Sequence, residues 1–432
     1  MAIKIIRTLP AMLLALSAMP LMAQSAAKAE AGREVTFSKD IAPILQRACQ
    51  NCHRPNNIAP MSLLTYKEVR PWARAIQEKV TARSMPPWFV DKNVGIREFK
   101  DDPSLSDDEI KLISAWADGG AHEGNVAEMP PPRQFDDTGQ WHIGKPDLVI
   151  QSPVAFTVKA RGTDWWGNLV VETGLTEDRY IKAVETKPSP HGGTRVLHHS
   201  VQTLLDEEGN PDGGTLNEYA VGKNGDYFPE GSGKLMRAGS KLQFNVHYHS
   251  VGEEITDQAS LGVVFYPKDY VPKHVVRTIQ VASTDLDIPA GEENARSDAY
   301  YKFDKATKVT GFMPHMHNRG KAECLEAIYP DMRVEPLNCV SRFNFGWQIV
   351  YNYTDESAPL LPAGTILHVI NWHDNSARNQ WNPDARNWVG YGERTNDEMS
   401  KAWVNFYSMT DEEYKAEVDA RSAKKRSLTS RR

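Results

Sequence analysis

Hydrophobic residues recur at helical spacing in the early part of the chain and in short strand-like runs in the rest. From Phe37 to Ala48, apolar side chains stand three or four residues apart, which predicts an amphipathic helix. A second helix is expected to begin at Pro71 and to bury Trp72, Ile76 and Val80, because Pro71 would break a helix that began at the capping-box sequence Thr65 to Glu68.

A third helix is predicted after Ser106-Asp107-Asp108-Glu109, another capping box. Its buried face would carry Ile110, Ile113, Trp116 and Ala117, and Gly119-Gly120 would end it.

The chain changes character after residues 123–146, which are rich in Pro, Gly and Asp and are predicted to be a linker. From Asp147 to about Met409, short runs rich in Val, Ile, Tyr, Phe and Trp alternate with turn residues, which predicts two sandwiches or jelly rolls. The interruption at Pro289-Ala290-Gly291 favours bounds of 147–281 and 282–412, followed by a basic tail at 413–432.

The first 23 residues are typical of a secretory signal. Lys4 and Arg7 precede an apolar run from Leu9 to Leu21, and Leu21-Met22-Ala23 is a plausible cleavage site. No other run approaches the ~20 apolar residues of a membrane span. We therefore expect an exported protein, periplasmic or secreted. Removing Lys4 and Arg7 changes the net charge from −6 to −8, which argues against nucleic-acid binding.

Cys49-Gln50-Asn51-Cys52-His53 follows the first predicted helix directly. A CxxCH motif after an export signal indicates covalently bound haem c, because both thiols add to the haem vinyl groups and the His takes an axial iron position. Met85, beside Pro86 and Pro87, is the favoured second axial ligand, and Met61 is the alternative. In these features residues 34–122 resemble the class I cytochromes c, which implies a small all-α domain.

Two imidazoles, His315 and His317, stand two residues apart in a strand-like stretch and should project from one face. Neutral imidazoles suit Zn, Cu, Fe or Ni, and a nearby Met would favour Cu(I). The third ligand is left open by spacing alone, with Met313 and Met316 as local candidates.

A second cluster joins His198-His199 to His247-Tyr248-His249. His247 and His249 share a strand face, but His198 and His199 would point in opposite directions on a regular strand. A site that uses both therefore requires a bulge or a strand end.

The ordered set His198-His199, Val246-His247-Tyr248, His315-x-His317-x-x-Gly320 and Thr395-x-Asp397-Glu398-Met399 resembles the copper type II ascorbate-dependent monooxygenases. This is the family of peptidylglycine α-hydroxylating and dopamine β-monooxygenase. The resemblance covers about 147–409 and implies two jelly rolls facing a wet cleft. It places an electron-transfer copper on His198, His199 and His247, and an oxygen-binding copper on His315, His317 and Met399, with His249 as a supporting residue.

The resemblance is incomplete at the substrate site. Met313 stands where peptide-hydroxylating members carry an Arg, and Lys401 and Trp403 replace an Asn and a Tyr. A glycine-extended peptide is therefore a doubtful substrate, and Lys401 could supply at most a different anion contact.

The expected protein is thus multidomain, with a small all-α class I cytochrome c domain followed by two all-β jelly-roll domains. The expected activity is a copper-dependent monooxygenation that uses O2 to hydroxylate a C–H bond of a small or medium organic substrate. Electrons would come through haem c from an external donor, such as a quinol-pool protein, a cytochrome or an ascorbate-like reductant. The alternative is a multi-centre electron carrier or copper-binding protein without oxygenation. A zinc hydrolase is disfavoured by Met399 and by the lack of a carboxylate base.

The two remaining cysteines, Cys324 and Cys339, should form a disulfide across a hairpin. If Asp331 and Met332 form a two-residue loop, Pro330 faces Arg333 and the cysteines lie directly opposite each other.

Overall fold

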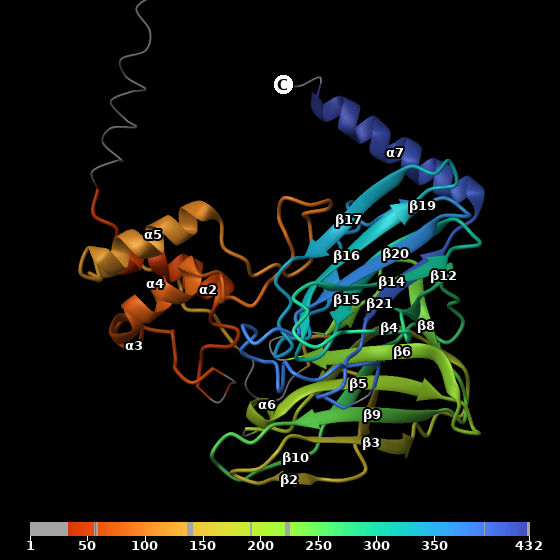
Figure 1. Ribbon diagram of the computed structural model, residues 1–432, viewed down its shortest axis with the longest axis horizontal. Helices are drawn as coiled ribbons and strands as arrows, with labels where there is room; N and C mark the ends of the chain where they lie inside the picture. The colour runs from red at the N-terminus through yellow and green to blue at the C-terminus, as the bar shows by residue number, and fades with distance from the viewer. Residues whose placement is uncertain are drawn as a thin grey trace, which may run out of the picture.

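The computed structural model describes residues 33–55, 57, 59–135, 141–190, 192–220, 225–392 and 394–429. The predicted signal at residues 1–23 lies outside this range. A helical N-terminal part stands beside two stacked β-sandwiches, and a long helix extends from the second sandwich (Figure 1). Among the described helices, none is long and apolar enough to cross a membrane.

The N-terminal part contains short helices around a core of its own. Phe37, Ile41, Leu45, Ile113 and Trp116 are almost completely buried in this core. The elements are η1 (Phe37–Ile41), α2 (Ala42–Ala48), α3 (Tyr66–Val69), η2 (Arg70–Trp72), α4 (Ala73–Thr81), α5 (Asp107–Asp118) and η3 (Val126–Glu128).

The first sandwich packs two sheets around one apolar core. Strand β9 shows why, since Leu242, Phe244 and Val246 alternate along it and are all buried. One sheet has the order β1-β11-β4-β8-β12 with β7 on β4, the other β3-β9-β5-β6, and β10 pairs with β2. The elements are β1 (Leu148–Gln151), β2 (Phe156–Val158), β3 (Trp165–Glu172), β4 (Arg179–Lys187), α6 (Gly193–Val196), β5 (Leu197–Leu205), β6 (Pro211–Ala220), β7 (Asp226–Tyr227), β8 (Ser232–Met236), β9 (Lys241–Tyr248), β10 (Ile255–Asp257), β11 (Ser260–Phe265) and β12 (His274–Val275).

The second sandwich has the sheet orders β13-β21-β15-β18, with β19 on β15, and β14-β20-β16-β17. Phe312 and Val404 from one sheet meet Leu325 and Val369 from the other in a shared core. The elements are β13 (Arg277–Ala282), β14 (Ala295–Lys302), β15 (Thr307–His315), β16 (Gly320–Ile328), β17 (Val334–Val340), β18 (Tyr351–Asn352), β19 (Leu360–Leu361), β20 (Ile366–His373) and β21 (Lys401–Ser408).

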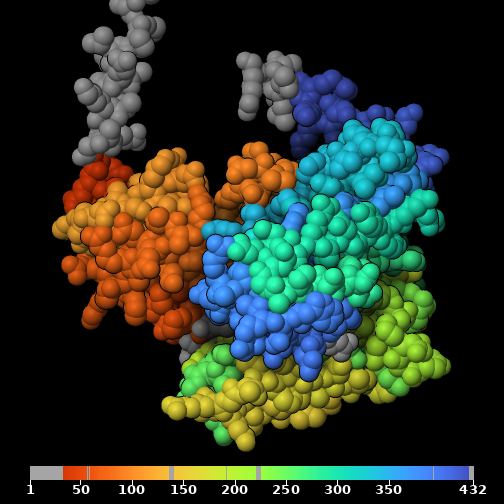
Figure 2. Space-filling model, viewed as in Figure 1, coloured from red at the N-terminus to blue at the C-terminus, as the bar shows by residue number. Residues whose placement is uncertain are grey.

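The predicted fold class, an all-α class I cytochrome c domain followed by two jelly rolls, is wrong. The structure is mostly β-sheet, and its N-terminal helices are short, between 4 and 12 residues in the α-helical elements. The N-terminal part is also not a self-contained helical domain. Phe89, Val90 and Phe99 belong to the core of the second sandwich. Val90 forms an isolated antiparallel β-bridge with Val340, and Phe99 forms one with Tyr353. In Figure 2 this part, red to orange, lies against the cyan and blue surface of the second sandwich.

The predicted helix start at Pro71 is also wrong. Thr65 and Glu68 form the capping box and α3 begins at Tyr66, while Pro71 lies in a single 3₁₀ turn that leads into α4. Proline fits the first turn of a helix, where its missing N–H is not needed, so it redirects the chain here without ending the helical run. Trp72 consequently points outward and is 44% exposed.

The C-terminal helix α7 (Asp411–Thr429) packs on the second sandwich along its first half. The Lys308 ammonium lies 2.8 Å from the Glu417 carboxylate, and the Arg421 guanidinium donates to the carbonyl oxygens of Ala358 and Asp355. The segment expected to be a basic tail is thus anchored at Glu417 and Arg421.

A disulfide joins Cys324 and Cys339, which pair directly across β16 and β17. The predicted two-residue turn is wrong, however, because Ile328 pairs with Val334 and Met332 adopts a left-handed conformation with φ 66°. A bulge that adds one residue to β17, after Pro336, restores the pairing of the cysteines.

Replacing both cysteines by alanine should lower the free energy of unfolding by about 3 kcal/mol, because the bond closes a loop of 15 residues. Urea unfolding of the oxidised protein measures this. An unfolding midpoint equal to that of the wild type would contradict the prediction, and reduced wild-type protein is the control.

Candidate metal centres

Three histidines meet at one end of the first sandwich. His199 on β5 pairs directly with His247 on β9, and the register shifts between Leu197 and His199. A site that uses both adjacent histidines was expected to need a bulge or a strand end, and the register shift supplies this irregularity. It allows His198 and His199 to reach the same site, and candidate ligand atoms of His198, His199 and His247 all lie within 4.8 Å of one another.

The hydrogen bonds of these rings indicate which nitrogen is free. His247 Nε2 lies 2.8 Å from the Asp164 carboxylate, which can only accept, so Nε2 carries the proton and Nδ1 keeps its lone pair. Nδ1 of His199 lies 3.3 Å from Nδ1 of His247 and 3.4 Å from Nδ1 of His198. Three Nδ1 atoms thus converge, an arrangement that fits one metal ion. Asp164 also holds His249 Nδ1 at 2.7 Å, so His249 supports the site without entering it.

The surroundings keep these imidazoles neutral. Burial, together with the neighbouring histidines, lowers the pKa of His199 well below 6.5. Burial, and then His198, lowers the pKa of His247 to about 4 although Asp164 opposes the shift. A neutral imidazole is the form that binds a metal, so protons compete little with a cation here.

His315 and His317, the second candidate site, lie where β15 ends. His315 Nδ1 lies 3.1 Å from Gln348 Oε1, and the Gln348 amide nitrogen donates to the carbonyl of Phe345, which fixes the amide orientation. His317 Nδ1 lies 3.0 Å from the carbonyl oxygen of Asp397. Both Nδ1 atoms therefore donate, which turns the Nε2 of His315 toward a possible metal; His317 has a second backbone hydrogen-bond partner, Arg394.

Met399 lies in the segment that enters β21 and is 7% exposed. Two residues later, Lys401 pairs directly with His315 across β21 and β15, so this segment runs beside the two histidines. The pKa of His315 is lowered well below 6.5, by burial and then by the charge of Lys401. Two imidazoles with a buried thioether on the neighbouring segment suit Cu(I).

The two histidine clusters lie near each other. His315 and His317 are close enough to His199 to contribute to its lowered pKa. The loop after β17 contacts both sites, since the Phe345 ring packs edge-on against His317 at 5.7 Å and the backbone of Gly346 hydrogen-bonds to His198. The neighbouring Gln348 holds His315. One short loop of the second sandwich thus contacts histidines of both sites.

The CxxCH motif lies at the end of α2. Cys49 and Cys52 are unpaired and partly buried. Burial raises the pKa of the Cys49 thiol to about 12 and also raises that of Cys52. His53 Nδ1 lies 3.3 Å from the carbonyl oxygen of Met61, which leaves Nε2 free. Two thiols and a free imidazole nitrogen fit covalent haem.

The two candidate axial methionines have different surroundings. The Met61 carbonyl accepts from His53 Nδ1, and its side chain packs against the core of the helical part. Met85 instead lines a cleft of about 500 Å³ together with Trp88 and Arg342. Cys49, Cys52 and His53 are not among the residues that line this cleft, so the cleft does not bring Met85 to the haem motif.

A cavity of about 140 Å³ lies between the sandwiches. Val201 and Asn217 of the first sandwich and Met313, Trp403 and Asn405 of the second are among its lining residues. Met313 precedes His315 by two residues and pairs with Trp403, so the cavity adjoins the second site.

Several residues of these sites were not identified from the sequence. Asp164 lies 83 residues before its partner His247, and Gln348 lies 33 residues after His315. Neither separation is typical of a metal ligand and the residue that hydrogen-bonds to it. Glu398 belongs to the sequence motif that contains Met399, but the motif did not indicate that Glu398 hydrogen-bonds to the turn after His317.

No family model matches the chain, and no curated protein matches it. Among solved structures, the chain is similar to the major capsid protein P2 of bacteriophage PM2, with 8% identity over 60% of this chain and 96% of that chain and a TM-score of 0.29. It is also similar to the infectious bursal disease virus VP2 subviral particle, with 10% identity over 66% of this chain and 76% of that chain and a TM-score of 0.19. Bacillus subtilis oxalate decarboxylase is similar with 8% identity over 65% of this chain and 80% of that chain, and with a TM-score of 0.12.

Proposed function

We propose that the chain is an exported copper-dependent monooxygenase that hydroxylates a C–H bond of a small or medium organic substrate. The observation that carries the proposal is the pair of neighbouring histidine clusters, three converging Nδ1 atoms on one sandwich and the His315 and His317 rings on the other, where the segment after Met399 pairs with His315. An all-imidazole site and a site with a thioether should bind chemically distinct coppers.

Bound copper would supply one-electron transfer at the first site and reaction with O2 at the second. Oxygenation of a C–H bond places one oxygen atom in the product and releases the other as water, which requires two electrons and two protons. Two sites that each store one electron therefore match the requirement. Asp164 and Gln348 hold His247 and His315 in the tautomers that can bind the metal.

The cavity between the sandwiches supports a substrate position next to the second site. Its 140 Å³ would suit a compact organic molecule or one part of a larger one. Met313 provides no charge for a substrate carboxylate, and the Lys401 ammonium lies 5.3 Å from the Trp403 ring beside the cavity. The lining also includes Lys100 and Lys234, so positive charge reaches the cavity from other positions.

Haem c at Cys49 and Cys52 would receive electrons from an external donor and pass them to the tri-histidine site. Tyr219 on β6 is buried, and its pKa is raised by this burial and by the nearby Asp257 and Cys52. The next residue along β6, Ala220, pairs with His199. The strand that borders the tri-histidine site therefore also runs near the haem motif, which favours this order of transfer.

The second iron ligand can be tested by substitution. Met85→Ala should remove the absorption band of a thioether bound to haem iron, while Met61→Ala should retain it, because Met61 supports His53 through its backbone carbonyl. Haem should stay on the denatured polypeptide in both variants. A band that survives in Met85→Ala and disappears in Met61→Ala would assign the ligand to Met61.

Incorporation of labelled oxygen tests the proposed function. Copper-loaded, reduced protein is mixed with ¹⁸O₂ and a metabolite pool, and products are screened by mass spectrometry. A product that gains one labelled atom only in the presence of copper supports monooxygenation. Haem and copper that transfer electrons to an acceptor, with no labelled product from any substrate, would instead indicate an electron carrier.

A further inference from the structure

We propose that Glu398, Arg319 and His373 form a buried positioning network that holds His317 and Met399 in place as ligands of one metal. This inference rests on the proposed function and adds three residues that do not themselves bind the metal. All three are buried, with exposed fractions of 0%, 2% and 0%.

The Glu398 carboxylate holds the turn that carries His317. One oxygen accepts a hydrogen bond from the backbone N–H of His317 at 2.8 Å, and the other accepts from the backbone N–H of Arg319 at 2.6 Å. Only a group with two acceptor oxygens can satisfy both donors in this geometry. Since Glu398 directly precedes Met399, it ties the backbone of one proposed ligand to that of the other.

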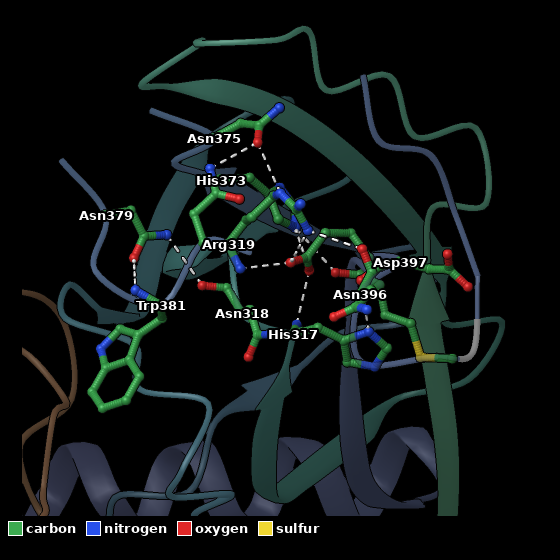
Figure 3. A network of polar contacts seen from close by, with 12 residues as sticks. His317, Asn318, Arg319, His373, Asn375, Asn379, Trp381, Asn396 and Asp397 are labelled. Carbon is green, nitrogen blue, oxygen red and sulfur yellow. Dashed lines mark hydrogen bonds and ion pairs between the residues drawn. The ribbon is translucent and has the colours of Figure 1, made fainter. Parts of the chain in front are cut away.

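The Arg319 side chain also contacts the segment that precedes Met399. Its Nη1 donates to the carbonyl oxygen of Asn396 at 3.0 Å and lies 4.0 Å from the Glu398 carboxylate. Its Nε donates to the Asn375 side chain, which in turn donates to the carbonyls of Pro289 and Asn387. Figure 3 shows Arg319 between Asn375 and Asn396, with His317 below.

His373 holds the Met399 backbone. Its Nε2 lies 3.0 Å from the carbonyl oxygen of Met399, so this nitrogen carries the proton and donates. His373 ends β20 and pairs with Gly320 of β16, three residues after His317. The carbonyl of Met399 and the turn after His317 are thus both connected to the end of β20.

A buried ion pair contributes little net stability when a similar apolar packing could replace it. Here the charged groups are used to fix backbone positions in two segments about 80 residues apart in sequence. Fixed ligand positions raise metal affinity, and loss of a supporting partner typically lowers it by about 10–100-fold. This argues that the network serves ligand geometry more than global stability.

Glu398→Gln tests the proposal, because the amide retains one acceptor but turns an NH₂ group toward the second N–H. We expect the Cu(I) affinity of the second site to fall about 10–100-fold and the sulfur signal in X-ray absorption to weaken, with the tri-histidine site unchanged. Glu185→Gln is the matched control, since Glu185 is a buried carboxylate that accepts from the backbone N–H of Ile143 in the other sandwich. This variant should leave second-site affinity unchanged.

His373 provides an independent pair of variants. His373→Leu removes the donor to Met399 and should weaken the same sulfur signal, whereas His373→Gln retains an N–H donor and should preserve more of it. Unchanged second-site affinity and sulfur signal in Glu398→Gln or, should that variant not fold, in His373→Leu would overturn the positioning role. A wild-type protein that binds no copper at His315 and His317 would overturn the proposed function instead, so the two failures are distinguishable.

Discussion

Replacing Met399 by alanine is expected to abolish O2-dependent turnover while leaving haem and the first copper in place. The thioether stabilises Cu(I), the form that reacts with O2, and the tri-histidine site lies in a different sandwich with its own core. Loss of a direct ligand should cost more than the 10–100-fold typical of a supporting residue, so second-site affinity should fall more than about 100-fold.

Haem reoxidation after O2 addition, in the presence of substrate, measures this effect. The matched control is Met409→Ala, since Met409 is a buried methionine just beyond β21 that packs with Val276 and Tyr407. It should lose some stability and retain oxygenation. Full copper-dependent oxygenation by Met399→Ala would contradict the assignment of the oxygen site.

Replacing His247 by alanine should have an equally large effect on turnover through the other copper. His247 contributes one of three converging Nδ1 atoms and is the ring oriented by Asp164. Two imidazoles would remain, so first-site affinity should fall more than about 100-fold while the second site keeps its copper. Electrons from haem should then no longer reach the second site.

Copper content and EPR spectra of the variant test this second prediction. His368→Ala is a suitable control, because His368 is also buried and held by a carboxylate, with Nε2 2.7 Å from Asp298, but it belongs to neither site. Loss of copper from both sites in His247→Ala would contradict two sites in separate sandwiches, and normal turnover would remove the tri-histidine site from the electron path.

The candidate histidines were recognised from the short spacings of His198-His199 and His315-x-His317, whereas His247 lies 48 residues after His199. Because strand side chains alternate, adjacent His198 and His199 could share a site only at a bulge or a strand end, and the structure has a register shift there. Their supporting residues could not be predicted in this way. Asp164 and Gln348 come from separate segments, and only the folded chain brings them to the rings.

The fold could be predicted from the sequence less completely than the candidate site. Phe89, Val90 and Phe99 gave no sign in the sequence that they would enter the second sandwich, because isolated apolar residues in a loop do not indicate their partner. Because these three residues pack into the second sandwich, the helical part is not an independent domain. The turn at Met332 was missed for a local reason, since a non-glycine residue with positive φ is uncommon.

Copper-dependent oxygenation is tested most directly by a stopped-flow measurement of haem reoxidation by O2, with substrate present, in copper-loaded and copper-depleted wild-type protein. Haem should be reoxidised together with product formation only when both coppers are bound, with two electrons consumed for each oxygen atom incorporated. Reoxidation of the haem at the same rate and with the same yield in the copper-depleted protein would contradict it.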